Sequence, residues 1–253
     1  MNDYLVTDED GQAKEWDQTS YYKDFLTNGG MVNDAIYKNR DKRFYASIIY
    51  DGCSYFANTV WLREGGNLYY SSKSTEVWGM PVSGYVYRKC VYEAKRLLNS
   101  EKTGYHYILL RLGRSYLNYA EVKLRQGDKE KAIEYINKTR VEHGGLPELS
   151  KSISLEEAWK EYKRERRVDL VSEGDRYWTV LRWGKAEGLE VVPELTVTQK
   201  FMKIAPDGKS FEITELPIYV SDNERTFTSK RYLFPVPQGE RDQNSNLDQN
   251  EGW

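Results

Sequence analysis

Apolar positions recur with helical spacing in the middle of the chain. A first run, from residue 105 onward, carries its apolar face on Leu110, Leu117, Ala120 and Leu124. Gly127 and Asp128 then interrupt the pattern with the residues of a tight turn. A second run carries its apolar face on Ala132, Ile133 and Ile136 and ends before a pair of glycines. The spacing therefore predicts a helical hairpin over residues 105–142.

A capping signal opens the next predicted helix. Ser154 and Glu157 form an S-x-x-E capping box, in which each side chain satisfies a free backbone N–H of the first turn. Apolar residues follow at helical spacing, at Leu155, Ala158, Trp159 and Tyr162. Gly174 breaks this helix, and residues 175–184 predict a second, shorter helix that ends at Gly184.

The remaining segments lack a helical period. Residues 1–40 are polar and irregular and do not resemble the start of a compact domain. Residues 41–60 are rich in β-branched and aromatic side chains and predict one or two short strands around Gly52. Residues 61–88 predict a long loop, and such loops often carry function. Residues 189–231 predict loops and short strands, and the tail that follows is expected to be extended and polar.

The charge balance narrows the classes of partner. Lys and Arg total 37 and Asp and Glu total 39, which gives a net charge of −2. This balance offers no basic footprint for nucleic acid and no reason to bind anionic lipid. No stretch of about 18 apolar residues is present to span a membrane. The first residues show neither a signal peptide nor a lipid-attachment cysteine, so we expect a cytoplasmic protein or a fragment without its natural start.

Patterns typical of metal and cofactor sites are missing from the sequence. The two cysteines, Cys53 and Cys90, and the two isolated histidines, His106 and His143, do not form a zinc motif. Two acidic runs lack the ligand ladder of a calcium loop, and no phosphate-binding, dinucleotide-binding or nucleophile motif occurs. We therefore expect no metal, no cofactor and no catalytic residue. A disulfide between the two cysteines stays open, because their spacing does not decide it.

Tyrosine and tryptophan are the unusual feature of the composition. The chain holds 21 Tyr and 7 Trp but only 7 Phe. Six rings crowd into the predicted loop, at Trp61, Tyr69, Tyr70, Trp78, Tyr85 and Tyr87. Aromatic planes pack against the C–H-rich faces of sugars, and Asn67, Ser71 and Ser72 could bond sugar hydroxyls. The first five rings are candidate ligand contacts, although half or more of the rings could instead anchor the loop on the helices.

Charged side chains concentrate between residues 164 and 184. Glu165, Asp169 and Glu173 are four residues apart and share one stripe of a helix. Paired carboxylates could serve acid–base chemistry. The arginines nearby favour a structural role instead, because Arg binds carboxylates in bidentate geometry and lowers their pKa values. The predicted structural ion network comprises Glu165, Arg166, Asp169, Glu173, Arg176 and Arg182.

Four sequence segments occur in a fixed order along the chain. They are DKRFYASIIYDG at 41–52, LRLGRSYLNYAEVKLRQGD at 110–128 followed by GGLP, ERRVDLVSEGDRYWTVLRWG at 165–184, and YLFPVPQGERDQNSNLDQNEGW at 232–253. Together these segments resemble the SusD/RagB family over roughly residues 40–253. The departures from the family pattern concern mainly turn residues, namely Lys42, Thr179, Ser245, Glu251 and Trp253.

The resemblance implies a mostly α-helical, SusD-like fold with tetratricopeptide-like hairpins, long loops and a few short β-strands. It implies a loop-rich, ligand-binding segment at 1–104, the hairpin and signature helices at 105–188, and loops with a C-terminal tail at 189–253. It also implies an outer-membrane lipoprotein on the cell exterior that captures oligosaccharides for a SusC-like, TonB-dependent transporter. Family members are longer, so we expect a C-terminal portion whose lipid anchor lies outside this chain.

Other functions remain open beside this leading hypothesis of an oligosaccharide binder without enzymatic activity. Some members of the family capture peptides instead. The hairpin at 105–142 resembles a single tetratricopeptide repeat, which cannot bury its apolar face alone, so an intracellular scaffold that binds a partner peptide is another hypothesis. The carboxylates and tryptophans suggest a glycoside hydrolase, which turnover lost in Glu165→Gln would support.

Overall fold

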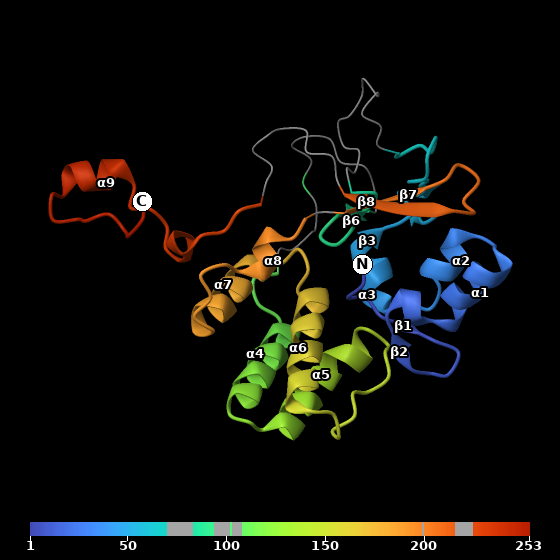
Figure 1. Ribbon diagram of the computed structural model, residues 1–253, viewed down its shortest axis with the longest axis horizontal. Helices are drawn as coiled ribbons and strands as arrows, with labels where there is room; N and C mark the ends of the chain where they lie inside the picture. The colour runs from blue at the N-terminus through green and yellow to red at the C-terminus, as the bar shows by residue number, and fades with distance from the viewer. Residues whose placement is uncertain (70–82, 94–101, 103–107, 199, 216–224) are drawn as a thin grey trace. The chain divides into compact units, whose positions relative to one another are not determined.

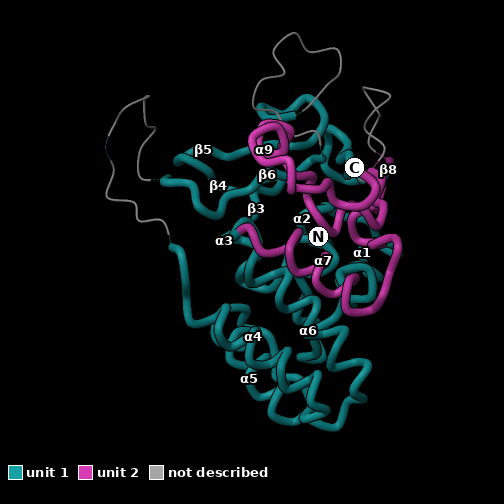
Figure 2. The backbone as a smooth tube through the Cα atoms, turned by 90° about the vertical axis from the view of Figure 1, so that its left-hand side faces the viewer, with its two compact units in different colours: residues 1–173, 200–214 teal, residues 174–199, 215–253 magenta. Residues whose placement is uncertain are grey.

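A computed structural model describes the chain in two compact units. The described residues are 1–69, 83–93, 102, 108–198, 200–215 and 225–253. The first unit comprises residues 1–173 and 200–214, and the second comprises residues 174–199 and 215–253 (Figure 2). These units differ from the segments expected at 1–104, 105–188 and 189–253, which remain a prediction. Within the described residues, no helix is both long enough and apolar enough to cross a membrane.

Three helices form one layer of the first unit (Figure 1). They are α4 (Leu112–Arg125), α5 (Lys129–Glu142) and α6 (Leu155–Asp169). The predicted hairpin is confirmed as α4 and α5, and both of its helices pack against α6. The apolar face buries Leu117, Ala120, Leu124, Ala132, Ile133 and Ile136. Helix α6 therefore covers the face that a single hairpin could not bury alone.

The first helix of this hairpin begins later than predicted, at Leu112 rather than at residue 105. Leu110 is 83% exposed and precedes α4, whose N-cap is Arg111 in extended geometry. The Arg111 side chain bonds Asp169 and Glu173, which holds this residue outside the helix. The capping box of α6 is confirmed: Ser154 Oγ accepts from the Glu157 N–H at 3.1 Å, and Glu157 Oε2 accepts from the Ser154 N–H at 2.9 Å.

The N-terminal segment belongs to the core, contrary to expectation. It forms β1 (Val6–Thr7), β2 (Ala13–Lys14), a 3-10 turn η1 (Trp16–Gln18), α1 (Ser20–Asn28) and α2 (Val32–Ile36). Its few apolar side chains are buried together with Phe44, Val168 and Met202, and they include Tyr4, Val6, Trp16, Val32, Ile36 and Tyr37. The sparse apolar positions hid this contribution, because the elements are short and pack against residues distant in sequence.

The segment at 41–60 begins with a helix where strands were predicted. Helix α3 (Lys42–Ser47) starts at Asp41, whose side chain accepts a hydrogen bond from the Arg43 N–H at 2.9 Å. This N-cap outweighs the strand preference of the aromatic and β-branched residues. The predicted strands follow as very short elements, namely β3 (Ile48–Ile49), β4 (Ser54–Tyr55) and β5 (Asn58–Thr59).

Strand pairs connect distant parts of the first unit. Strand β3 pairs antiparallel with β6 (Val86–Tyr87), and β4 pairs with β5 as a hairpin. Strand β7 (Lys200–Ile204) pairs with β8 (Phe211–Glu215). Met202 and Ile204 of β7 lie in the main core. Strand β7 also accepts a hydrogen bond from the Glu64 N–H at the Ile204 carbonyl, 2.9 Å long, which ties the loop after β5 to the sheet.

The second unit contains short helices and connecting loops. They are α7 (Arg176–Ala186), α8 (Pro193–Thr196), a 3-10 turn η2 (Ser229–Tyr232) and α9 (Gln238–Gln243). The short helix predicted at 175–184 is confirmed as α7, which runs two residues further. The fully extended tail is a wrong prediction, because α9 forms within it. Tyr232 fixes the tail by donating its hydroxyl to the Leu189 carbonyl at 2.7 Å.

Candidate functional site

Trp61 is the best-exposed ring among the described ligand candidates. It is 38% exposed and follows β5. The Arg63 guanidinium lies over its ring, 4.3 Å from the centroid. Asp51 holds Arg63 through bonds of 3.0 and 2.6 Å from Nε and Nη2, and the Asp51 side chain is fully buried. A buried carboxylate thus fixes the cation that orients the exposed ring.

Asn67 closes the loop that carries Trp61. Its Oδ1 accepts a hydrogen bond from the Trp61 N–H at 2.8 Å, and its Nδ2 donates to the Thr59 carbonyl at 3.0 Å. Each end of the amide makes one bond within the loop, so Asn67 holds the loop that carries Trp61. Gly66 permits the same closure, since a Cβ there would lie 2.3 Å from the Trp61 carbonyl oxygen.

Tyr85 lies between the core and a small pocket. Its hydroxyl lies 3.0 Å from the Tyr37 hydroxyl and 3.2 Å from Met202 Sδ. Burial raises the pKa of Tyr85 to about 12. Its ring lines a pocket of about 200 Å³ together with Tyr4, Phe44 and Tyr87. Tyr87 is 60% exposed at this site. The pocket is small and aromatic, which suits one ring-shaped moiety better than a long ligand.

The remaining ring candidates lie elsewhere. Tyr69 is half-buried in the loop after Trp61. Tyr70 and Trp78, with Ser71 and Ser72, lie outside the described residues. Strand β7 is the common support for the described rings, because Glu64 bonds its Ile204 carbonyl and Tyr85 contacts its Met202.

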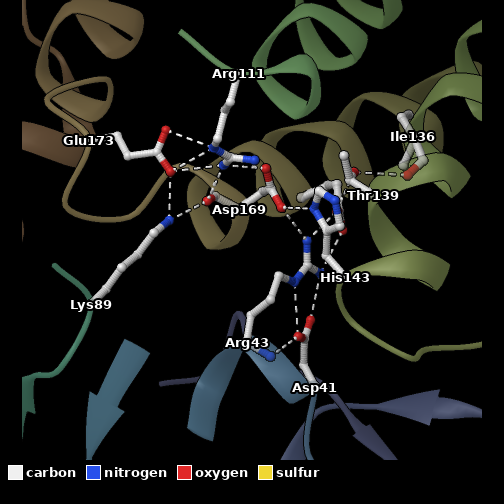
Figure 3. Close-up of polar contacts among 10 residues, drawn as sticks. Asp41, Arg43, Lys89, Arg111, Ile136, Thr139, His143, Asp169 and Glu173 are labelled. Carbon is white, nitrogen blue, oxygen red and sulfur yellow. Dashed lines mark hydrogen bonds and ion pairs between the residues drawn. The ribbon is translucent and has the colours of Figure 1, made fainter. Parts of the chain in front are cut away.

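A second, charged pocket lies beside α6. It has a volume of about 360 Å³, and its lining includes Arg43, Lys89, Arg111, His143, Asp169 and Glu173. Figure 3 shows how these side chains converge from α3, the segment after β6, the start of α4 and the end of α5 onto the C-terminal end of α6. Most of the polar atoms in this pocket are engaged by one another.

Asp169 is at the centre of this ion network. Its Oδ2 lies 2.5 Å from Arg111 Nη2, and its Oδ1 lies 2.8 Å from His143 Nδ1 and 3.3 Å from Arg43 Nη1. Glu173 binds Lys89 Nζ at 2.6 Å and Arg111 Nη2 at 2.9 Å. Arg43 also joins Asp41 at 2.6 Å. The network therefore links five chain segments.

The carboxyl groups in this pocket are held in their charged form. Burial raises the pKa of Asp169, but the His143 hydrogen bond and the charges of Arg111 and Arg43 outweigh it, so the pKa is lowered. The pKa of Glu173 is also lowered, because bonds from Arg111 and Lys89 outweigh burial. A general acid needs a raised pKa. This arrangement is suited to holding segments together rather than to donating protons.

The sequence prediction found the acidic members of the network and missed most of their partners. Glu165 accepts from Thr139 Oγ1 at 2.6 Å and from Arg43 Nη2 at 3.1 Å. Arg166 is buried and donates to Asn118 Oδ1 at 2.8 Å. The predicted members Arg176 and Arg182 lie in the second unit. The missed cations are Arg43, Lys89 and Arg111. Arg43 was detectable as a charge inside an aromatic run, whereas Lys89 and Arg111 carry no such local signal.

Comparison with known proteins gives consistent matches. The model of the SusD family matches residues 1–253. A SusD-like protein from Bacteroides fragilis NCTC 9343 is 26% identical, with a TM-score of 0.73 over 100% of this chain and 45% of the solved chain. This chain belongs to the SusD family. A SusD-like carbohydrate binding protein from the same strain has the same fold at 20% identity, with a TM-score of 0.59 over 98% of this chain and 47% of its own. No curated protein matches the chain.

Membership of the SusD family confirms the resemblance and corrects its extent. The family match includes residues 1–40, whereas the resemblance found in the sequence segments began near residue 40. The mostly helical fold with a few short strands is also confirmed. The chain spans 45% of the length of the first SusD-like protein that it matches.

The two cysteines of this SusD-family chain are not paired with each other. Cys53 is buried and Cys90 is exposed, and both are free, so the disulfide left open by the sequence does not form. Across the described residues, no group of three or more His, Cys, Asp or Glu side chains is arranged to hold a metal ion.

Proposed function

We propose that this chain is part of a cell-surface protein that binds oligosaccharide nutrients through ring-bearing loops. The observation that carries the proposal is the exposed Trp61 ring, held in place by the Asp51–Arg63 pair. A pre-positioned ring loses little conformational entropy when a sugar stacks on it. Family membership supports the proposal, as does the carbohydrate-binding description of a structural neighbour in Bacteroides fragilis.

The same proposal includes delivery to a transporter. Bound sugars would pass to a SusC-like, TonB-dependent transporter in the outer membrane, on the exterior face of the cell. Membrane association would depend on a lipid anchor. Co-purification of the full-length protein with such a transporter from the native membrane tests this part, and a full-length protein recovered only from the cytoplasm would contradict it.

We propose binding without catalysis. The carboxylates that suggested a glycoside hydrolase, Glu165, Asp169 and Glu173, are bonded to Arg43, Lys89 and Arg111. The lowered pKa values of Asp169 and Glu173 remove the protonated acid that glycoside hydrolysis needs. Glycan turnover by the purified chain that disappears in Glu165→Gln would contradict this part.

Calorimetric titration against a panel of soluble neutral glycans tests the binding site. Trp61→Ala should weaken binding of the preferred glycan by about 1–3 kcal/mol without unfolding the protein, as for a central stacking anchor. Trp178→Ala is the matched control, because Trp178 is exposed but lies in the second unit. Equal affinities of the wild-type and Trp61→Ala proteins would remove Trp61 from the site.

The titrations also separate the alternatives. Absence of glycan binding together with peptide binding would assign the chain to the peptide-capturing members of the family. Trp78→Ala applies the same test to a candidate outside the described residues.

A further inference from the structure

The outer seam of the α4–α5 hairpin carries a surface of tyrosines and lysines. On α4, Tyr116, Tyr119 and Lys123 follow one another at intervals of three and four residues, which places them on one flank of the helix. On α5, Lys131, Tyr135 and Lys138 follow the same kind of spacing. None of these six residues is among the buried residues of either helix. We call them the seam surface.

The rings of the seam surface meet across the two helices. The Tyr119 and Tyr135 centroids lie 4.4 Å apart, and the Tyr116 and Tyr135 centroids lie 5.7 Å apart with the rings edge to face. Tyr119 is 39% exposed, and the other two rings are half-buried. No hydrogen bond of the three hydroxyls is found in the part of the chain that the structure describes. The seam thus offers ring edges and free hydroxyls to solvent.

Three ammonium groups surround these rings. Lys138 Nζ lies 4.4 Å from the Tyr135 centroid and 4.9 Å from the Tyr116 centroid. Lys123 and Lys131 each lie 5.5 Å from a ring centroid. Lys131 pairs with Glu134 at 2.8 Å and Lys123 with Asp128 at 3.4 Å, both on the surface. For Lys138, the described residues supply no carboxylate within salt-bridge distance.

We infer that the seam surface is a second binding site, separate from the Trp61 loop, that takes anionic saccharides. The tyrosines present ring edges and hydroxyls to a sugar ring, and the lysines pair with its carboxylate or sulfate groups. The lysines can leave their ring contacts and surface carboxylates at little cost, because such contacts are weak in water. A neutral sugar would gain only the ring contacts. This site extends the proposed function and does not depend on the Trp61 loop.

Titration of the whole chain with charged and neutral polymers tests the inference. The probes are polygalacturonate for carboxylate, dextran sulfate for sulfate and unmodified dextran as the neutral reference. We expect one or both anionic probes to bind, and the binding to be lost at about 1 M salt, where charges are screened within about 3 Å. The probe that binds shows whether the site prefers carboxylate or sulfate. Failure of both anionic probes, or equal binding of dextran, would overturn the inference.

Two variants separate a built site from diffuse attraction. Exchange of Lys123, Lys131 and Lys138 for Gln should weaken anionic binding at least about tenfold, given the usual strength of surface ion pairs. The charge-matched control exchanges Lys23, Lys160 and Lys209, which lie outside the seam. An equal loss in both triple variants would overturn the site, because net charge alone would then explain the binding.

Tyr119→Ala tests the ring contribution without changing any charge. We expect a severalfold loss of anionic binding with an unchanged melting curve, since Tyr119 is already partly exposed. Unchanged affinity would contradict contact between the sugar and the rings of the seam surface. Trp61→Ala in the same titrations should leave anionic binding intact, so failure of the proposed Trp61 site and failure of the seam site give different results.

Discussion

Arg43 illustrates how one residue holds distant segments together. It belongs to α3, yet it bonds Asp41 at its own N-cap and both Glu165 and Asp169 of α6. Its side chain is 9% exposed, so its charge depends on these partners for compensation. Local sequence carries no signal for this pairing, because 122 positions separate Arg43 from Glu165. Long-range ion pairs of this kind follow from the fold and not from local pattern.

Removal of this guanidinium should be costly. Arg43→Met leaves Asp41, Glu165 and Asp169 without their shared cation, and we expect the free energy of unfolding to fall by about 3–5 kcal/mol. Arg167→Met is the matched control, because Arg167 is 54% exposed and pairs with Asp3 at 2.9 Å on the surface. Its loss should cost no more than about 1 kcal/mol. Urea unfolding measures both, and equal losses would contradict a buried network.

At the scale of elements, the sequence predicted helices α4 to α7 and the presence of short strands, but not which strands pair. The hairpin, the capping box and α7 depend on local signals, namely an apolar period, an N-cap and a terminating glycine. Strand β3 contains two residues, and its partner β6 lies almost 40 positions away in sequence, with Ile48 opposite Tyr87. Strands so short and so distant in sequence pair only once the core has folded. Helix α3 was missed because its Asp41 cap precedes residues that favour strands.

The capping box of α6 offers a direct test at this scale. Ser154→Ala removes the acceptor for the Glu157 N–H, and we expect a loss of about 1 kcal/mol in the free energy of unfolding. Ser152→Ala is the control, because the Ser152 hydroxyl meets only the exposed Ser150 hydroxyl, 2.7 Å away. Thermal unfolding that fails to separate the two variants would contradict the contribution of the cap.

For the whole molecule, the sequence distinguished buried ion pairs from exposed rings only in part. Glu165, Asp169 and Glu173 were interpreted as one structural stripe of a helix; each pairs with a cation, but Glu173 lies beyond α6, which ends at Asp169. Of the ring candidates, Trp61 is exposed, whereas the hydroxyl of Tyr85 is bonded within the core. Local sequence cannot distinguish these two outcomes, because both rings occur in loops with similar composition. The difference arises from tertiary contacts: the Tyr85 hydroxyl meets Tyr37 and Met202, whereas the Trp61 ring packs against Arg63.

The ion network also predicts how stability depends on pH. The pKa values of Asp169 and Glu173 are lower in the folded protein, so their contribution is complete above the ordinary carboxyl pKa near about 4. It is lost as the pH falls through the lowered values. We expect the free energy of unfolding to decline below about pH 4, and more shallowly in Glu173→Gln. Glu9→Gln, at an exposed site, is the control. If the free energy of unfolding declines in parallel in the wild type, Glu173→Gln and Glu9→Gln, Glu173 does not contribute to the pH dependence.

The central claim is that the charged pocket is framework and the exposed rings bind the ligand. Calorimetric titration of one preferred glycan into Glu173→Gln and Trp61→Ala, with a melting curve for each, tests it most directly. The account predicts that Glu173→Gln melts at a lower temperature with unchanged affinity, whereas Trp61→Ala keeps its melting temperature and loses affinity. Lost affinity in Glu173→Gln together with intact affinity in Trp61→Ala would contradict the account and place recognition in the charged pocket.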